Sequence, residues 1–226
     1  MPKAPAKRRA APRKSPAERA RIEALFERFA NAESDPRTEL DYSSPYTLLA
    51  AVALSAQATD VAVNKATTRL FAVADTPGKM LELGEAGIIP YIASIGLFRT
   101  KAKNLVAAAR ILVDTHGGEV PLEREALQAL PGVGRKTASV VLNELGVEPA
   151  IAVDTHVFRV SHRLGLARGK TPDKVEHELM STIPDPWRTR AHHWLILHGR
   201  YVCIARRPKC GDCPVAELCP SRGREA

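Results

Sequence analysis

Four cysteines lie close together near the carboxyl end of the chain. They are Cys203, Cys210, Cys213 and Cys219, and the chain has no other cysteine. The amino-terminal residues lack the apolar segment of a secretory signal, so we expect a reducing compartment, where clustered thiols bind metal rather than form disulfides. Four thiolates can hold either a zinc ion or a [4Fe-4S] cluster, and the spacing does not separate these cofactors. On residue types alone zinc is favoured, because four-cysteine zinc sites are widespread.

A pair of glycines marks a second candidate site. Gly132 and Gly134 flank Val133 and stand between two expected helices, residues 122–130 and 135–145. Glycine permits backbone conformations closed to other residues, and the N–H groups at the start of the second helix can bind phosphate. An ordinary helix-to-helix turn can also contain this pattern. Since Arg135 and Lys136 follow directly, we predict a helix-hairpin-helix contact with DNA.

A single carboxylate, Asp154, precedes an apolar-periodic run in the segment Val153–His156. An Asp in this position is most often a helix N-cap, because its carboxylate accepts hydrogen bonds from the first N–H groups of the helix. Capping is compatible with catalysis, since a helix N-terminus stabilises an ionised carboxylate. The residue types alone therefore predict a cap and leave a catalytic role open.

These motifs, in this order, resemble the endonuclease III family of helix-hairpin-helix DNA glycosylases, and the resemblance spans about residues 17–220. It implies base excision repair: a bifunctional DNA glycosylase and AP lyase that removes oxidised pyrimidines from double-stranded DNA. The cysteine spacing, with Pro220 after the last cysteine, is similar to the family's [4Fe-4S] loop. The resemblance therefore reverses the preference for zinc.

The resemblance also assigns roles to residues. Lys136 matches the nucleophile of the bifunctional members, and Asp154 matches their catalytic carboxylate. Gln57 would fill the gap left by a flipped nucleotide, and Leu97 would insert between base pairs. Further DNA contacts are expected at Gly132, Val133, Gly134, Arg135, His156, Arg206, Arg207 and Lys209.

By the same resemblance, Lys136 attacks C1′ of the deoxyribose, forms a Schiff base and permits β-elimination of the 3′ phosphate. A lysine nucleophile must be partly neutral, although the ordinary pKa of a lysine side chain is about 10.4. We therefore expect a desolvated site near Arg135 and helix termini. The alternative role for Lys136 is a phosphate contact.

Two competing functions fit part of the sequence. Mismatch adenine glycosylases have a similar cluster but normally lack lysine at the nucleophile position and carry an additional C-terminal domain, whereas here Lys136 is present and seven residues follow Cys219. A non-enzymatic DNA-binding module with zinc would explain the glycines and cysteines. It would leave the segment Val153–His156 without a role.

The elements that must position these residues are helices, and the sequence predicts an all-α fold. Three helix starts are expected where a hydroxyl residue precedes proline. They are Ser44-Pro45, Thr76-Pro77 and Thr171-Pro172. Residues 48–54 are apolar all round, which predicts a central buried helix. No sustained alternation of apolar and polar residues predicts a strand.

Other helical patterns are one-sided. A helix is expected over 101–116, ending at Gly117 and Gly118. Val175, Leu179 and Ile183 recur every four residues and predict a buried stripe. His192, His193 and His198 invite a metal hypothesis, but helical histidines of the core or surface are the better interpretation.

By resemblance, two helical lobes bind DNA across a cleft. Residues 38–148 form a six-helix lobe with the hairpin, and residues 17–37 join 149–226 in the cluster lobe. This division places Lys136 and Asp154 at the seam between the lobes.

The charge of the chain is concentrated at its amino end. The chain has 226 residues, 45% of them hydrophobic, and a formal net charge of +8. Residues 1–20 hold seven basic side chains and one acidic side chain, or +6. Residues 1–16 therefore predict a disordered basic arm on a near-neutral body that meets a polyanion. The longest uncharged run, residues 42–59, is too polar for a membrane anchor, so we expect a cytoplasmic monomer, associated with the nucleoid if the source is bacterial.

Overall fold

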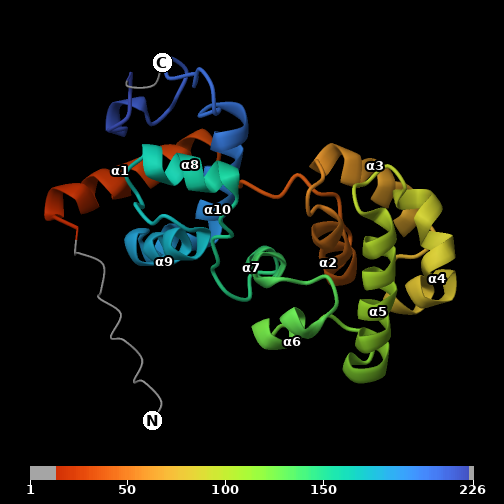
Figure 1. Cartoon of the computed structure of the whole chain (residues 1–226). Coiled ribbons are helices and arrows are strands. Elements are labelled where there is room, and N and C mark those ends of the chain that lie inside the picture. Colours follow the sequence, from red (N-terminus) through yellow and green to blue (C-terminus); the bar gives the residue numbers. More distant parts are fainter. Residues whose placement is uncertain (1–13, 224–226) are drawn as a thin grey trace, which may run out of the picture. The chain divides into compact units, whose positions relative to one another are not determined.

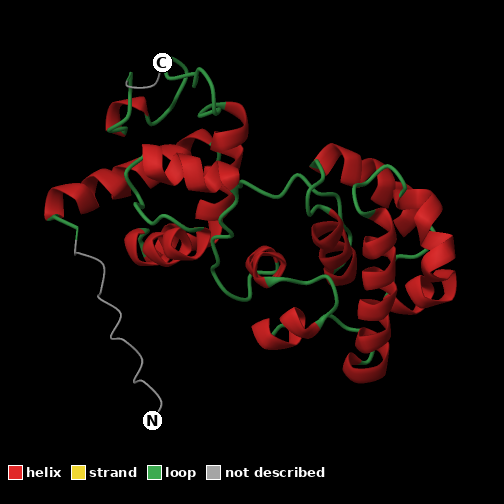
Figure 2. Ribbon diagram, in the orientation of Figure 1, coloured by secondary structure: helices red, strands yellow, loops and turns green. Residues whose placement is uncertain are grey.

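The computed structural model describes residues 14–223, and these residues contain helices and loops but no strand (Figure 1 and Figure 2), which confirms the all-α prediction. Residues 1–13, most of the predicted arm, lie outside the described residues. The chain divides into two compact units. Residues 36–152 form the hairpin unit, and residues 14–35 with 153–223 form the cysteine unit.

Hydroxyl caps begin the helices where they were predicted. The side chains of Ser44, Thr76 and Thr171 accept hydrogen bonds from first-turn N–H groups, and each is followed by proline. A fourth start of the same kind, Ser15-Pro16, begins α1 (Pro16–Ala32) with a capping box that includes Glu18. Residues 14–16, assigned to the arm, therefore belong to the folded cysteine unit.

The hairpin unit is built around α2. Its helices are α2 (Pro45–Leu54), α3 (Asp60–Phe71), α4 (Pro77–Ile92), α5 (Phe98–His116), α6 (Arg124–Ala129) and α7 (Arg135–Glu144). Helix α2 packs against α3, α5 and α7 and is buried on nearly every side, as the continuous apolar run predicted. Helix α4 has a kink at Gly84, where φ is 63°. Helix α5 begins three residues before the predicted Lys101 and ends at Gly117, as predicted.

The cysteine unit joins the two ends of the described chain. It contains α1, α8 (Thr155–Arg163), α9 (Pro172–Thr182), η1 (Asp185–Trp187), α10 (Arg188–Tyr201) and η2 (Ala216–Leu218). Phe26 and Phe29 of α1 pack near Trp194 of α10, with ring centroids 6.1 and 6.5 Å from that of the indole. Figure 1 shows α1 beside the later helices of this unit, which sequence separation alone would not indicate.

Close packing in this unit fixes α8 against α10. A Cβ on Gly199 of α10 would stand 2.9 Å from the Cβ of His156 on α8, so only glycine allows this approach.

The predicted stripe of Val175, Leu179 and Ile183 is buried. The histidines of α10 are core residues, as predicted: His192, His193 and His198 are all buried.

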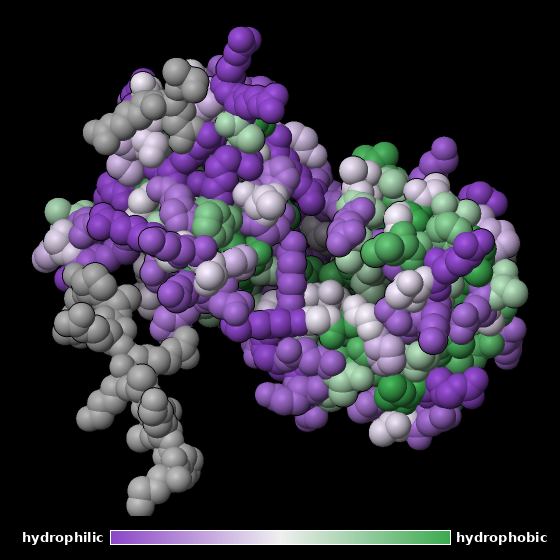
Figure 3. All heavy atoms as spheres, in the orientation of Figure 1, coloured by the Kyte–Doolittle hydropathy of each residue, from purple (hydrophilic) through white to green (hydrophobic). Residues whose placement is uncertain are grey.

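Exposed apolar side chains gather on the hairpin unit. Most of the large ones lie there: Tyr42, Val61, Val73, Leu97, Val113, Leu122 and Val147. Figure 3 shows hydrophobic patches over α3 to α5 on the face in view. No helix of residues 14–223 is long and apolar enough to cross a membrane.

Candidate active site

The hairpin between α6 and α7 has the tight turn that its glycines predicted, but the two glycines serve different purposes. Gly132 has φ +81°, and a Cβ there would stand 3.0 Å from the Cβ of Asn104 on α5. Both facts require glycine. Gly134 has an ordinary extended conformation with φ −87°, so the expectation of an unusual backbone is wrong at this position. Open space surrounds its missing Cβ.

Gly134 instead leaves the start of α7 uncapped. It is the N-cap residue of the helix and has no side chain that could accept hydrogen bonds from the first N–H groups. Arg135 and Lys136, the first two helical residues, are exposed, while Val133 behind them is buried. The hairpin thus presents backbone donors and two cationic side chains together, which suits a phosphate backbone.

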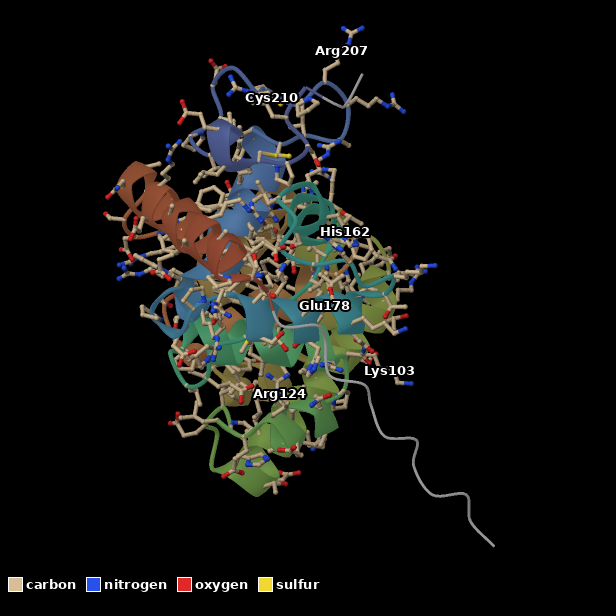
Figure 4. All side chains as sticks on the ribbon, turned by 90° about the vertical axis from the view of Figure 1, so that its left-hand side faces the viewer. Lys103, Arg124, His162, Glu178, Arg207 and Cys210 are labelled. Atoms are coloured by element: carbon tan, nitrogen blue, oxygen red, sulfur yellow. The ribbon has the colours of Figure 1, made fainter. Side chains whose placement is uncertain are left out.

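A residue that the sequence analysis missed braces this hairpin. Arg124 of α6, labelled in Figure 4, donates a 2.8 Å hydrogen bond to the Ser139 hydroxyl of α7 and pairs with Glu148 beyond that helix. The guanidinium fixes the two hairpin helices to each other. No sequence pattern indicated this contact, because the partners lie 15 and 24 positions from Arg124 without a common period.

Gln57 and Leu97 lie on neighbouring loops of the hairpin unit. Gln57 occupies the turn between α2 and α3, and Leu97 directly precedes α5. Both side chains are exposed, Leu97 by 62%. A Cβ on Gly96 would stand 3.8 Å from the carbonyl oxygen of Gln57, so the two loops are in contact. The structure therefore brings these two predicted insertion residues together.

Backbone strain coincides with predicted DNA contacts. Three non-glycine residues among residues 14–223 have a left-handed backbone. They are Gln57, Leu97 and Arg207, with φ of 57°, 60° and 55°. Each such conformation costs roughly 1–2 kcal/mol relative to a relaxed residue. Such strain is concentrated at functional positions, where the surrounding structure holds it.

Asp154 begins α8, and the predicted N-cap is confirmed. Its Oδ1 accepts a 2.7 Å hydrogen bond from the N–H of Val157. The side chain is half-buried, and the following Thr155 is exposed. One carboxylate oxygen thus has a helix partner, while the aspartate stays accessible. His156 lies in the first turn of the same helix, with its Nδ1 3.4 Å from Arg159.

Two arginines of α8, which the sequence analysis missed, hold the cysteine loop. Arg159 donates from Nε to the carbonyl of Cys203 at 3.1 Å. Arg163 donates to the carbonyls of Ile204 at 2.7 Å and Ala205 at 3.0 Å, and its Nη1 lies 3.5 Å from the Cys203 sulfur. Their spacing of four residues shows only that they share a helix face. Their carbonyl partners, some 40 residues away, carry no side-chain signature.

The four cysteine thiols fit a cluster of iron and sulfur. All four are free and partly buried. Burial raises the pKa of Cys213, an N–H hydrogen bond from Val215 opposes this shift, and the neighbouring thiols Cys219, Cys203 and Cys210 raise it further. The thiols are therefore close enough to interact electrostatically, and a backbone N–H group donates to the Cys213 sulfur, a contact that tunes iron–sulfur sites.

No group of three or more His, Cys, Asp or Glu side chains among the described residues is placed to hold a single metal ion. A four-iron cluster is larger than one ion, so its thiolates stand farther apart.

The loop between the first two cysteines carries the predicted basic residues. Arg206, Arg207 and Lys209 are all exposed. Figure 4 shows Arg207 extending away from the fold, with Cys210 on the same loop. The backbone N–H of Lys209 donates to the Val202 carbonyl at 3.0 Å, which closes the loop. The structure thus groups these three cations beside the thiols.

The predicted site residues divide between the two units. Gln57, Leu97, Gly132, Val133, Gly134, Arg135 and Lys136 lie in the hairpin unit; Asp154, His156, Arg206, Arg207, Lys209 and the four cysteines lie in the cysteine unit. The meeting of Lys136 and Asp154 at a seam stays a prediction. So do the lobe boundaries inferred from the resemblance.

Two family models match this chain. Residues 50–185 match the HhH-GPD superfamily of base excision DNA repair proteins. Residues 203–219 match the iron–sulfur binding domain of endonuclease III. The second match covers the four cysteines from the first to the last. It assigns them an iron–sulfur cluster, [4Fe-4S], rather than the alternative zinc ion.

Relatives match nearly the full described chain. The sequence is 57% identical over 198 residues to endonuclease III of Rickettsia conorii, which covers 88% of this chain and 94% of that protein. It is 55% identical over 195 residues to endonuclease III of Escherichia coli strain K12, covering 86% and 92%.

A solved structure has the same fold. It is a trapped covalent intermediate of endonuclease III with DNA, with a TM-score of 0.83 and 43% sequence identity, covering 91% of this chain and 97% of the other. These matches confirm the resemblance stated from the motifs and exclude a mere DNA-binding module. The chain belongs to the endonuclease III family of the HhH-GPD superfamily of base excision DNA repair proteins.

Proposed function

We propose that this enzyme removes oxidised pyrimidines from double-stranded DNA, with Lys136 as the nucleophile of both glycosylase and lyase steps and Asp154 as the supporting carboxylate. The glycosylase and AP lyase activities are those of its family. The observation that carries the residue assignment is the exposed amine of Lys136 on the first, uncapped turn of α7. There a phosphate bound by the helix N-terminus would bring the sugar within reach of the amine.

The chemistry begins at the sugar. The Lys136 Nζ attacks C1′ as the C1′–N bond to the base breaks, and the positive charge that develops on the sugar resembles an oxocarbenium ion. After ring opening the amine and C1′ form a Schiff base. Loss of a C2′ proton then expels the 3′ phosphate by β-elimination. Burial within the hairpin unit does not supply the predicted desolvation of Lys136, because this side chain is exposed.

Asp154 supports these steps through its charge. Its Oδ1 accepts the hydrogen bond from the Val157 N–H at the start of α8. An ionised carboxylate stabilises the positive sugar and can accept the proton that Lys136 loses on attack. The second carboxylate oxygen would carry this role, because the first is engaged in the cap.

Base flipping precedes the chemistry, since the glycosidic bond of a stacked base cannot be reached. Gln57 and Leu97 suit the vacated space, because both are exposed on adjacent loops and hold strained backbones. The hairpin residues 132–135 bind consecutive phosphates of one DNA strand. The cations Arg206, Arg207 and Lys209 and the ring of His156 supply further contacts.

The cluster serves a structural purpose in this proposal. Cys203, Cys210, Cys213 and Cys219 would hold it, and four metal–thiolate bonds would close the loop that carries the three cations. The DNA-bound form is a monomer in the cytoplasm, at the nucleoid in a bacterial cell.

Borohydride trapping tests the nucleophile. A duplex with one thymine glycol is incubated with the parent protein and with Lys136→Ala, then reduced. The parent should form a covalent adduct and Lys136→Ala none, while both bind a duplex with an uncleavable abasic analogue within about threefold of each other. Lys103→Ala is the matched control, since this exposed lysine of α5 points away from the fold (Figure 4) and should trap like the parent.

An adduct of undiminished yield with Lys136→Ala would move the nucleophile elsewhere. Absence of an adduct from a folded, DNA-binding parent would sink the Schiff-base mechanism. Trapping on an ordinary abasic site but not on thymine glycol would overturn the assigned lesion class alone.

A further inference from the structure

Lys101 is a buried lysine whose charge faces backbone carbonyls. The residue is 8% exposed, although it lies in the first turn of α5. Its Nζ donates to the carbonyl of Leu54 at 2.9 Å and to the carbonyl of Ala56 at 2.6 Å. Leu54 is the last residue of α2, where helix carbonyls lack partners and the helix dipole favours a cation, and Ala56 lies two residues beyond it in the following turn.

The position of these carbonyls matters because Ala56 is the residue directly before Gln57. The ammonium therefore holds the last turn of α2 at the point where the backbone enters the left-handed conformation of Gln57, with φ 57°. Removal of the ammonium would leave two carbonyls without this donor. The turn would then be free to relax the strain at Gln57.

The same residue also anchors the second insertion loop. The backbone N–H of Lys101 donates to the carbonyl of Leu97 at 3.0 Å, and Leu97 has φ 60° and no side-chain cap for α5. One lysine thus contacts both loops, through its side chain on one and its main chain on the other. Gly96 beside Leu97 lies against the Gln57 carbonyl, so the loops also meet directly.

A phosphate contact is the ordinary role for a lysine in a DNA-binding protein, and burial argues against it here. Lys103, two residues on, is exposed and directed outward in Figure 4, whereas the Lys101 ammonium donates to carbonyls inside its unit. Burial also lowers the pKa of the Lys101 ammonium from its ordinary value. Its role is therefore internal to the unit.

We infer that Lys101 is a positioning residue that fixes the Gln57 and Leu97 loops to each other, so that both side chains enter a DNA duplex as one preformed wedge. This inference rests on the insertion roles given to these two residues in the proposed function. It adds a residue, and a physical means, that hold the wedge before DNA binds.

The test measures base unstacking without chemistry. 2-Aminopurine is placed opposite a tetrahydrofuran site, which the enzyme binds but cannot cleave, and its fluorescence rises when it leaves the stack. Lys101→Met keeps the length and apolar stem of the side chain and removes the charge. We expect its unstacking equilibrium to fall about tenfold, with affinity for undamaged duplex within twofold of the parent and with kcat on thymine glycol reduced more than KM.

Matched variants separate positioning from general loosening. Lys103→Met, which removes the same charge from an exposed site, should behave as the parent. In a Gln57→Ala background, Lys101→Met should lower unstacking by less than twofold further, because the wedge is already broken. Lys101→Gln keeps a hydrogen-bond donor, so its unstacking equilibrium should lie between those of the parent and Lys101→Met. This variant replaces Lys101→Met in the test if the Met variant does not fold.

The outcomes distinguish the positioning role of Lys101 from the insertion roles of the two loops. Normal unstacking in Gln57→Ala and in Leu97→Ala would overturn the insertion roles themselves. The positioning role alone would be overturned if unstacking is reduced in Gln57→Ala and Leu97→Ala but is normal in Lys101→Met and Lys101→Gln. A full tenfold loss for Lys101→Met in both the parent and Gln57→Ala backgrounds would also overturn it, since the lysine would then act independently of the wedge.

Discussion

At the scale of single residues, Asp154 combines two physical roles that mutation can separate. Its Oδ1 caps α8, and the proposed chemistry uses the negative charge of the same carboxylate. An uncharged side chain with an oxygen at the same place would keep the first role and lose the second. The sequence indicated both the capping role and the catalytic role, but it could not show which of them a given mutation would remove.

Asp154→Asn should leave the free energy of unfolding within about 0.5 kcal/mol of the parent, because Asn is as good an N-cap as Asp. Single-turnover glycosylase rates should nevertheless fall at least 100-fold, since general acid–base and charge stabilisation contribute factors of this order. Urea denaturation and single-turnover kinetics on thymine glycol DNA are the measurements.

Asp154→Ala provides the comparison. It should lose the activity and also about 1 kcal/mol of stability, because the Val157 N–H loses its acceptor. Wild-type turnover by Asp154→Asn would show that the cap, and not the charge, is what the reaction needs.

At the scale of elements, the first turns of α5 organise the predicted DNA contacts of the hairpin unit. Leu97 directly precedes this helix, Lys101 holds the Gln57 turn, and Asn104 lies against Gly132 of the hairpin. Lys101 and Asn104 are three residues apart and share one face of α5, and Leu97 is the N-cap of the same helix. One helix therefore carries contacts to both the insertion loops and the phosphate-binding turn.

The two hairpin glycines give opposite predictions. Gly132→Ala should lower the free energy of unfolding by about 2 kcal/mol, because φ +81° is unfavourable for alanine and its Cβ would crowd Asn104. Gly134→Ser should not destabilise the protein and should raise stability by up to about 0.5 kcal/mol, since a serine hydroxyl would cap α7.

Gly134→Ser should nevertheless weaken DNA binding several-fold, because the new hydroxyl would occupy the N–H groups that we assign to phosphate. Urea denaturation and fluorescence anisotropy with a lesion-containing duplex measure the two effects. Unchanged affinity in a stabilised Gly134→Ser variant would show that the start of α7 does not bind DNA.

At the scale of the whole molecule, charge is distributed unevenly along the chain. Residues 1–20 contribute +6 of the net charge of +8. The folded units therefore depend on local groups of cations, such as Arg206, Arg207 and Lys209, rather than on a general positive charge. We expect the basic residues of the amino-terminal arm to supply the long-range attraction to DNA.

Deletion of residues 1–13 should flatten the salt dependence of DNA binding. These residues contain five basic side chains and no acidic one, while Lys14 and the Ser15 cap remain with the folded unit. The slope of log K against log salt concentration should become less steep by up to about 4.5, at roughly 0.9 for each phosphate neutralised. Anisotropy titrations at several salt concentrations measure it.

The yield of borohydride trapping at saturating protein should not change on this deletion, because the arm takes no part in the chemistry. An unchanged slope would instead assign the basic residues a role other than contact with DNA.

The sequence by itself determined the helical class, most helix starts and the chemical groups. Hydroxyl–proline pairs act within a few residues, so Ser44, Thr76 and Thr171 could be identified as caps without knowledge of the fold. The cysteine spacing and the segment around Asp154 are also local patterns, and the family match confirmed the function that they indicated.

Only the tertiary structure decided which distant groups meet. The carbonyls that receive Lys101 and Arg163 lie more than 40 residues from these side chains, and a backbone carbonyl has no signature in the sequence. The sequence pattern of α5 gave no indication that Lys101 is buried, because a lysine in a helix is expected to reach solvent. Local propensity does not encode chain topology. The topology buries the Lys101 ammonium against the turn that precedes Gln57, where it contacts backbone carbonyls and not solvent.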